Sequence, residues 1–400
     1  MHYLPRIVLI SLAFYLPAGV VLASHNAQHT DDDDDKHYTS ARQQTDLDLI
    51  EYNKQILEAY NKYKAKVAQV WGDESVIPDA KTDVTYRDQM QQRSVVDFEE
   101  GSVNVEIAIT ADDDAQARSI EERLAKAIEQ TILEPSDERS IVEIAEDPEP
   151  PKSENPPALQ DLIADEKGNP LRLEGIDAFK RHTSHRAKRR FITGRDGKKR
   201  VLITTQFHLV PNHIRVRAEK FRDVIDRNAA LHRIPAPLIF AIIETESMFN
   251  PRAKSPVPAF GLMQLVPQTG ARDAYKYLYR KDKVVKESYL YEPKNNVELG
   301  AAYLHLLYFR HFKHIKNHDA RQWVTIAAYN TGAINVLRSF AGEYTRANYP
   351  SIWSWKSNAI NQINNMKPEQ VFDYLRQYLP AEETRDYLQK VRERMDKYNI

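Results

Sequence analysis

The first half of the chain alternates between helical and strand-like patterns of apolar residues. Apolar positions recur at helical spacing after Thr45 and stop just before Gly72, and they alternate with polar ones at 94–110, around a turn that contains Gly101. A second helical stripe runs over 117–128, preceded by three acidic residues that suit a helix start. Because a helix, a hairpin and a second helix follow one another, this half predicts a small α+β domain. The first stripe consists of Leu49, Ile56, Tyr60, Tyr63, Val67 and Val70.

Helical spacing dominates from Val216 to the end of the chain, where few segments alternate as strands do. This half therefore predicts a mostly α-helical domain, and the two halves together predict an α+β fold. We place the boundary between residues 212 and 213, with an amino-terminal domain over 45–212 and a helical domain over 213–400. Two helices are predicted near the carboxyl terminus, after helices at 221–231, 237–246, 296–309 and 323–329.

Two stretches of the first half have an unusual composition. Residues 134–166 include eleven acidic residues, two basic ones and six prolines, so we expect an exposed insertion that buries little apolar area. Residues 186–200 carry eight Lys or Arg against Asp196 alone, and strands on either side predict a hairpin. Because stacking aromatic residues do not alternate with the basic ones, we expect no nucleic-acid site but a solvated basic hairpin. The alternative is weak attraction to anionic glycan or phospholipid of the cell envelope.

Overall composition narrows the classes of function. With 400 residues and 42% hydrophobic content the chain is long and apolar enough for two domains, and its net charge of −1 offers no global attraction to nucleic acid. The absence of cysteine excludes disulfides, thiolate metal sites and a cysteine nucleophile. We expect no metal and no other cofactor. His311, His314 and His318 have the spacing of a helical metal face, but the lysines between them favour a solvated basic face.

The first 23 residues have the pattern of a secretory signal peptide. Arg6 precedes an apolar run over 7–23, and the small residues at its end suit cleavage before Ser24. A membrane-spanning helix is the alternative, but the run has 17 residues, short of the ~20 that a bilayer requires. We therefore expect an exported, periplasmic protein. Residues 24–44 contain a block of aspartates at 31–35 that repels itself, so they predict a flexible acidic spacer.

The stretch over 234–264 joins an apolar helix to two carboxylates. Pro237 suits the start of this helix, and Asn250 and Pro251 follow its end. The positions three, four, seven and eight residues before Glu246 are all isoleucine or leucine, so its carboxylate projects from the most apolar stripe. Burial there would raise the pKa of a glutamate, as a general acid at neutral pH requires. The alternative is that both glutamates, Glu244 and Glu246, face water at a frayed helix end.

Several ordered motifs around this helix resemble those of the lytic transglycosylases, which are lysozyme-fold enzymes that cut peptidoglycan. The segments 259–264 and 327–332 and the closing stretch 379–387 carry this resemblance, together with Glu246 and Ser255. The match covers 217–400, and the helical domain is accordingly expected to be lysozyme-like. Residues 86–101 resemble, less specifically, the amino-terminal domain of the membrane-bound lytic murein transglycosylase C group. The lipoprotein form of that group needs a cysteine at its mature start, so a lipid anchor is not expected here.

The resemblance implies a reaction that uses one carboxylate twice. Glycoside cleavage usually needs two carboxylates, but Glu244 lies about 200° around the helix from Glu246, so the two should not face the same bond. By resemblance, Glu246 protonates the MurNAc–GlcNAc glycosidic oxygen and then deprotonates the MurNAc C6 hydroxyl, which closes a 1,6-anhydro ring without water. Simple hydrolysis by a muramidase and a glycan-binding scaffold of low turnover are the alternatives.

The resemblance also assigns residues that contact the peptidoglycan glycan strand. For any one of them ordinary packing is the alternative, because Met and Tyr at helical spacing are usually core residues. The chain departs from the family at two positions. Many relatives carry serine where this chain has Val257, and relatives often have an uncharged residue where this chain has Glu244. Glu244 either perturbs Glu246 electrostatically or is solvated. The matching substrate-binding positions are Ser255, Gly261, Met263, Gln264, Tyr329 and Asn330, with Tyr303 and Tyr387 as weaker matches.

Overall fold

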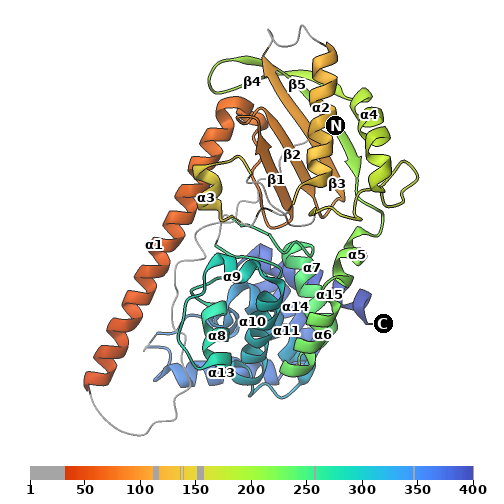
Figure 1. Ribbon diagram of the computed structural model, residues 1–400. Helices are drawn as coiled ribbons and strands as arrows, with labels where there is room; N and C mark the ends of the chain where they lie inside the picture. Colours follow the sequence, from red (N-terminus) through yellow and green to blue (C-terminus); the bar gives the residue numbers. More distant parts are fainter. Residues whose placement is uncertain are drawn as a thin grey trace. The chain divides into compact units, whose positions relative to one another are not determined.

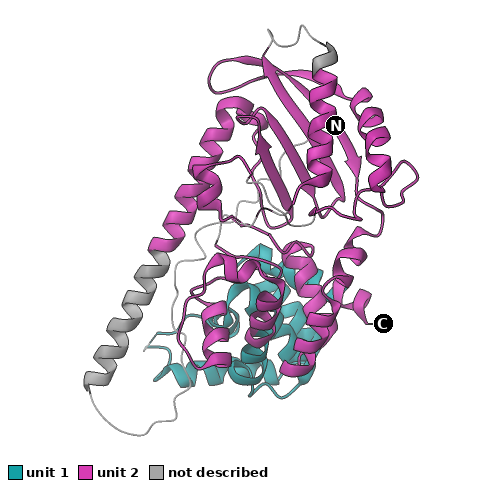
Figure 2. Ribbon diagram, viewed as in Figure 1, with its two compact units in different colours: residues 1–48, 304–393 teal, residues 49–303, 394–400 magenta. Residues whose placement is uncertain are grey.

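The computed structural model describes residues 32–110, 117–135, 137, 139–150, 157–255, 258–345 and 347–399. The chain divides into two compact units, which we describe separately (Figure 2). The first, called the sheet unit, comprises Leu49–Tyr303 and Arg394–Ile400, and the second, the helical unit, comprises Met1–Asp48 and Leu304–Glu393. The boundary that we expected between 212 and 213 stays a prediction, and the expected signal peptide lies outside the described residues.

The sheet unit contains one five-stranded antiparallel sheet with strand order β1-β2-β3-β5-β4 (Figure 1). Both expected hairpins are confirmed, one as β2 and β3 and the basic one as β4 and β5. With the helices that follow, the sheet confirms the α+β fold. The strands are β1 (Thr82–Arg87), β2 (Gln92–Asp97), β3 (Ser102–Thr110), β4 (Lys188–Thr193) and β5 (Lys199–His208).

Alternation along the strands places an apolar core on each face of the sheet. Val103, Val105 and Ile107 of β3 point to a core shared with α2 (Ala117–Leu133) and α4 (Ile176–His185), which lie across this face in Figure 1. On the other face, Ala108 of β3 and Leu202 of β5 pack with α1 (Asp32–Trp71) and α3 (Ile141–Glu146). The predicted stripe of the first helix is confirmed by the burial of Ile56, Tyr60, Tyr63 and Val67.

Two segments differ in structure from what their composition suggested. Residues 24–31 of the predicted spacer lie outside the described residues, and from Asp32 onward the spacer belongs to α1. The predicted insertion over 134–166 contains α3 and contributes to both cores. The average composition of this segment is polar, but six of its apolar residues are buried in the two cores. They are Ile141, Ile144, Ala145, Leu159, Leu162 and Ile163.

The remaining helices follow the sheet along the chain. Two helices were expected near the carboxyl terminus, but three are found after residue 350, because Pro368 begins one helix and Pro380 separates the last two. In the sheet unit the helices are α5 (His213–Glu219), α6 (Arg222–His232), α7 (Ala236–Ser247), α8 (Gly270–Tyr279), α9 (Glu287–Tyr291) and most of α10 (Pro293–Leu306). The helical unit continues with a π-helical turn (Leu307–His311), α11 (His318–Thr331), α12 (Ala333–Ala341), α13 (Ile352–Asn364), α14 (Pro368–Tyr378) and α15 (Glu382–Tyr398), whose last turn belongs to the sheet unit.

His213, at the start of α5, should make stability depend on pH. Its ring packs against Gly101, where an added Cβ would lie 2.8 Å from Nε2. Burial, helped by the nearby Arg217 charge, lowers the pKa of His213 from 6.5 to about 4. The unfolded chain therefore binds this proton first, and stability that is complete above pH 6.5 is lost as the pH falls toward 4.

We expect His213→Gln to reduce the loss of unfolding free energy between pH 7 and pH 5 (about the range in which a free histidine titrates). Urea unfolding at several pH values measures this loss. His208→Gln, at an exposed position of β5, is the matched control and should keep the wild-type dependence. An unchanged slope in the His213 variant would show that this ring does not contribute.

Candidate active site

Glu246 lies in the last turn of α7, a helix that is otherwise enclosed. The residues over 238–245 are all buried, and Ile239, Ile242 and Ile243 have no exposed surface. Pro237 lies in the first turn, as predicted, and the helix ends at Ser247. Glu246 itself is only partly buried. The apolar helix that ends in a carboxylate is therefore confirmed.

Glu244 is neither at a frayed end nor solvated. It has 1% relative exposure, and its carboxylate oxygens lie 2.8 Å from Lys397 Nζ and 2.6 Å from the Tyr398 hydroxyl. Arg394 Nε is 3.1 Å away as well. The alternative of a solvated Glu244 is thus excluded, because the last turn of α15 supplies partners that its local sequence does not contain.

Ser247 connects the end of α7 to the loop that follows. Its buried hydroxyl lies 2.8 Å from the Leu262 carbonyl oxygen and 3.1 Å from that of Ile243. Since a hydroxyl has one proton, it donates to one of these carbonyls at a time. The residue after Glu246 therefore fixes the position of the loop that carries Gly261, Met263 and Gln264.

Asn296 of α10 holds the same loop from the opposite side. It is fully buried, and its Oδ1 accepts a hydrogen bond from the Met263 N–H at 2.8 Å. Its Nδ2 donates to the Phe260 and Leu290 carbonyls, each at 2.8 Å. One amide side chain thus satisfies three buried backbone groups. Reading the sequence missed Asn296, although a polar residue four positions before Gly300 on an apolar helix was a usable signal.

Two glycines allow close approach around this loop. Gly261 has φ +75°, and a Cβ there would clash with the Leu290 carbonyl and the Asn296 amide. A Cβ on Gly300 would clash with the Met263 sulfur. Met263 is fully buried, which agrees with the packing alternative for that side chain, and its contact with substrate stays a prediction. Gln264 is partly exposed, and its Nε2 donates to the carbonyls of Ala253 at 3.2 Å and Gly261 at 3.0 Å.

The other predicted site residues are divided between the two units. Ser255 and Tyr303 belong to the sheet unit, where Ser255 is 9% exposed and the Tyr303 ring lies against Gly270. Tyr329, Asn330 and Tyr387 belong to the helical unit. There the Thr384 hydroxyl of α15 donates to Asn330 Oδ1 of α11 at 2.7 Å, so the residues at the end of α11 and the start of α15 are fixed together. Val257 lies outside the described residues.

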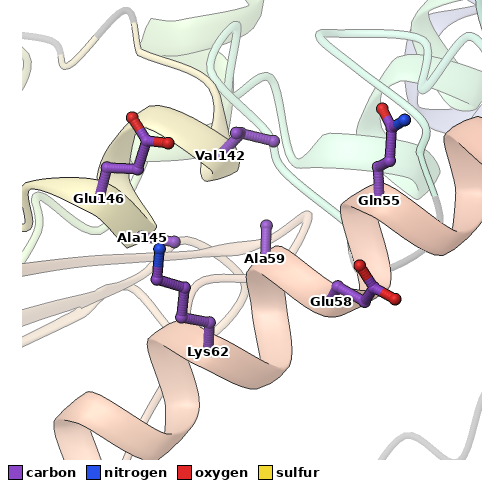
Figure 3. A pocket seen from close by; sticks show the side chains of 7 residues that line it. All are labelled: Gln55, Glu58, Ala59, Lys62, Val142, Ala145 and Glu146. Carbon is purple, nitrogen blue, oxygen red and sulfur yellow. The ribbon is translucent and has the colours of Figure 1, made fainter.

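A hollow of about 310 Å³ lies between α1 and α3 (Figure 3). None of the predicted site residues lines it, so it is not the predicted glycan cleft. Its lining residues are Gln55, Glu58, Ala59 and Lys62 of α1 and Val142, Ala145 and Glu146 of α3.

Comparison with known proteins finds matches over most of the chain. Residues 50–220 match the family model for the membrane-bound lytic murein transglycosylase C amino-terminal domain, and residues 223–352 match the transglycosylase SLT domain. A membrane-bound lytic murein transglycosylase C from Yersinia enterocolitica is 33% identical over 338 residues, which is 84% of this chain and 88% of the relative. The protein of the same name from Serratia proteamaculans is 32% identical over the same shares.

A solved structure is also similar in part. An inactive mutant of the lytic transglycosylase Slt from Pseudomonas aeruginosa is 25% identical with a TM-score of 0.33, over 44% of this chain and 23% of that one. Because the matched region is under a quarter of that chain and the TM-score is low, we base no geometry on this structure.

Proposed function

The chain belongs to the membrane-bound lytic murein transglycosylase C family, enzymes that act on peptidoglycan, and we propose that it cleaves the MurNAc–GlcNAc β-1,4 bond without adding water. Glu246 donates its proton to the glycosidic oxygen, and the bond from that oxygen to MurNAc C1 breaks. The resulting carboxylate then takes the proton of the MurNAc C6 hydroxyl while O6 bonds to C1. Glu246 ends protonated again, and the products are a GlcNAc hydroxyl and a 1,6-anhydroMurNAc end.

The observation that carries this proposal is the burial and pairing of Glu244. A hydrolase of the usual kind needs a second carboxylate near the first, as a base for water or as a nucleophile. Glu244 is the other carboxylate of the motif, but three partners from the end of α15 engage it. This arrangement supports a mechanism in which Glu246 exchanges the proton twice and the nucleophile is the substrate's own hydroxyl.

Product analysis tests the proposal. Purified sacculi are digested with the protein, and the released muropeptides are identified by mass spectrometry. Anhydro ends are the expected product. Reducing MurNAc ends would indicate a hydrolytic muramidase, and undigested glycan that retains bound protein would indicate a scaffold of low turnover, so either result would contradict the proposal.

We propose that the residues matched by the resemblance contact the glycan strand, and we describe those of each unit separately. Gly261 and Gln264 belong to a loop that Ser247 and Asn296 fix from two sides, as a binding surface requires. Tyr329 and Asn330 lie at the end of α11, where Thr384 holds Asn330. The remaining proposed contacts are Ser255, Met263, Tyr303 and Tyr387.

We also propose that the chain is exported by a signal peptide cleaved before Ser24, and that it acts in the periplasm. Amino-terminal sequencing of the mature protein tests this, and an intact first segment would contradict it. Among the helices that the structure describes, none combines the length and apolar character needed to cross a bilayer.

We also propose that the exposed lysines of the basic hairpin bind weakly to anionic lipid of the cell envelope. Lys188, Lys198 and Lys199 are exposed, whereas Arg190 is paired with Glu74 and Arg200 with Asp196. Each lysine near an anionic lipid surface contributes about 1 kcal/mol, so replacing all three by glutamine should weaken binding to phosphatidylglycerol vesicles by about 100-fold. Vesicle co-sedimentation at several salt concentrations measures this.

The matched control replaces the exposed Lys54, Lys62 and Lys64 of α1 by glutamine, which changes the net charge equally. It should bind vesicles like the wild type. If both triple variants lost vesicle binding equally, the net charge of the protein alone would account for the effect. If the wild type bound sacculi but not vesicles, glycan would be the anionic partner.

A further inference from the structure

The last turn of α15 contacts the helix that carries Glu246. The contact is made at Glu244. Lys397 and Arg394 both contact Glu244 Oε1, while the Tyr398 hydroxyl donates to Oε2. Arg394 Nη1 also lies 3.3 Å from the Glu244 backbone carbonyl oxygen. Both the side chain and the main chain of Glu244 are therefore held, two residues before Glu246.

Aromatic packing extends this contact along α7. The Tyr398 ring stacks on Phe240 with centroids 4.9 Å apart and also meets Phe249 edge-on at 6.3 Å. Phe240 precedes Glu246 on the helix and Phe249 follows it. Because side chains on both sides of Glu246 contact one ring, the end of α7 is fixed over more than one turn rather than at a single point.

Arg394 links this cluster to the sheet as well. Its side chain is 11% exposed and lies 3.5 Å from Glu99, in the turn between β2 and β3, as well as 3.1 Å from Glu244. Next to Glu99, the Phe98 ring lies 4.0 Å under the guanidinium of Arg217. The guanidinium of Arg394 therefore bridges the turn between β2 and β3 and the catalytic helix, and water screens its pair with the buried Glu244 less than its contact with the exposed Glu99.

We propose that Glu244 and Arg394 are positioning residues, which hold the carboxylate of Glu246 in its reactive place through the ion pair between α7 and the last turn of α15. The inference rests on the proposed function of Glu246. An acid that must give and then take a proton at two different substrate oxygens has to keep its place through both steps. The helix ends at Ser247, one residue after Glu246, and Met248 and Phe249 have a left-handed backbone conformation. No further helical turn therefore holds Glu246 in position.

A positioning role predicts a change in turnover rather than in binding. A misplacement of about 1 Å can lower a rate by up to ~100-fold, so we expect Glu244→Gln to lower kcat for muropeptide release by about tenfold. KM for sacculi should stay within about twofold of wild type, because interactions that act only in the transition state leave ground-state binding unchanged. Arg394→Met should have the same effect.

The double variant shows whether Glu244 and Arg394 act through their shared ion pair or affect the rate independently. If both residues act through the same contact, Glu244→Gln combined with Arg394→Met should lose no more activity than either single variant, rather than the product of the two losses. Asp282→Asn is the matched control, since it removes a carboxylate of the same unit that pairs with Arg272 and Lys276. Its kcat should equal that of the wild type within about twofold.

All rates are measured below the melting transition of each variant, because breaking a buried ion pair also costs stability. A well-folded Glu244→Gln with wild-type kcat would overturn the inference, and so would losses that multiply in the double variant. If Glu244→Gln does not fold, Arg394→Met decides the question, since it removes the other member of the ion pair while Glu244 keeps its contacts with Lys397 and Tyr398. An unchanged kcat in Arg394→Met would then overturn the inference, and a reduced one would support it.

The same digests distinguish this inference from the proposed function. Rates are counted from all released muropeptides, whereas the identity of their ends is scored separately. Reducing ends from the wild type would contradict the reaction proposed for Glu246, while the relative rates of the variants would still decide whether Glu244 and Arg394 position it.

Discussion

Replacement of Glu246 by glutamine is expected to lower the rate of 1,6-anhydromuropeptide release by about 10,000-fold or more, which amounts to loss of turnover. General acid or base help is typically worth ~100- to 10,000-fold, and a group that serves as both should lie at or above the upper end. Glutamine keeps the size of the side chain and can donate a hydrogen bond, but it cannot transfer a proton. Release from sacculi by the purified variant, followed by mass spectrometry, measures this loss.

Glu244→Gln is the matched control for this experiment, because it removes the same charge from the same helix. It should keep measurable turnover, with only the moderate loss expected of a positioning residue. Glycan binding and thermal melting of both variants exclude misfolding as the cause. A folded Glu246→Gln that releases products at a near-normal rate, while Glu244→Gln is inactive, would show that the acid is assigned to the wrong residue.

The second large effect is expected at Asn296. Its amide satisfies the Met263 N–H and the carbonyls of Phe260 and Leu290, all of them buried. Leucine has a similar size but leaves the Met263 N–H and the Leu290 carbonyl without this partner, whereas the Phe260 carbonyl still accepts from the Leu265 N–H at 3.1 Å. Because each buried unsatisfied group costs about 1–3 kcal/mol, we expect Asn296→Leu to lower the free energy of unfolding by about 2 kcal/mol or more, measured by urea denaturation.

The neighbouring Asn295 provides the control. It is only partly buried, and its Nδ2 makes one longer contact of 3.3 Å to the Tyr289 carbonyl oxygen. Asn295→Leu should change the free energy of unfolding by less than about 1 kcal/mol. Equal effects of the two substitutions would contradict the role given to Asn296, and an effect of Asn296→Leu below about 1 kcal/mol would do the same.

The elements that could be predicted from the sequence are those with a local pattern. The spacing of Ile56, Tyr60, Tyr63 and Val67 is that of a buried helix face, and α1 buries it. Alternation over 94–110 likewise predicted β2 and β3. The failures occur where composition was averaged over a window. Over 134–166 the acidic residues and prolines outnumber the apolar residues of α3, yet those few side chains decide where the segment packs.

The candidate site was predicted only in part, because several of its contacts join distant parts of the chain. The carboxylate at the end of an apolar helix was visible in the spacing of Ile239, Ile242 and Ile243. The partners of Glu244 were not, since they lie about 150 residues later in a charged helix whose pattern does not distinguish Arg394 from its neighbours. A buried carboxylate needs such partners, and sequence spacing alone cannot identify them.

Digestion of sacculi in water enriched with heavy oxygen tests the central claim most directly, because it asks whether water enters the products. If Glu246 closes the MurNAc C6 hydroxyl onto the anomeric carbon, mass spectrometry will find 1,6-anhydro ends that carry no heavy oxygen. Reducing MurNAc ends that carry heavy oxygen would mean that water is the nucleophile, and would contradict the mechanism proposed for Glu246.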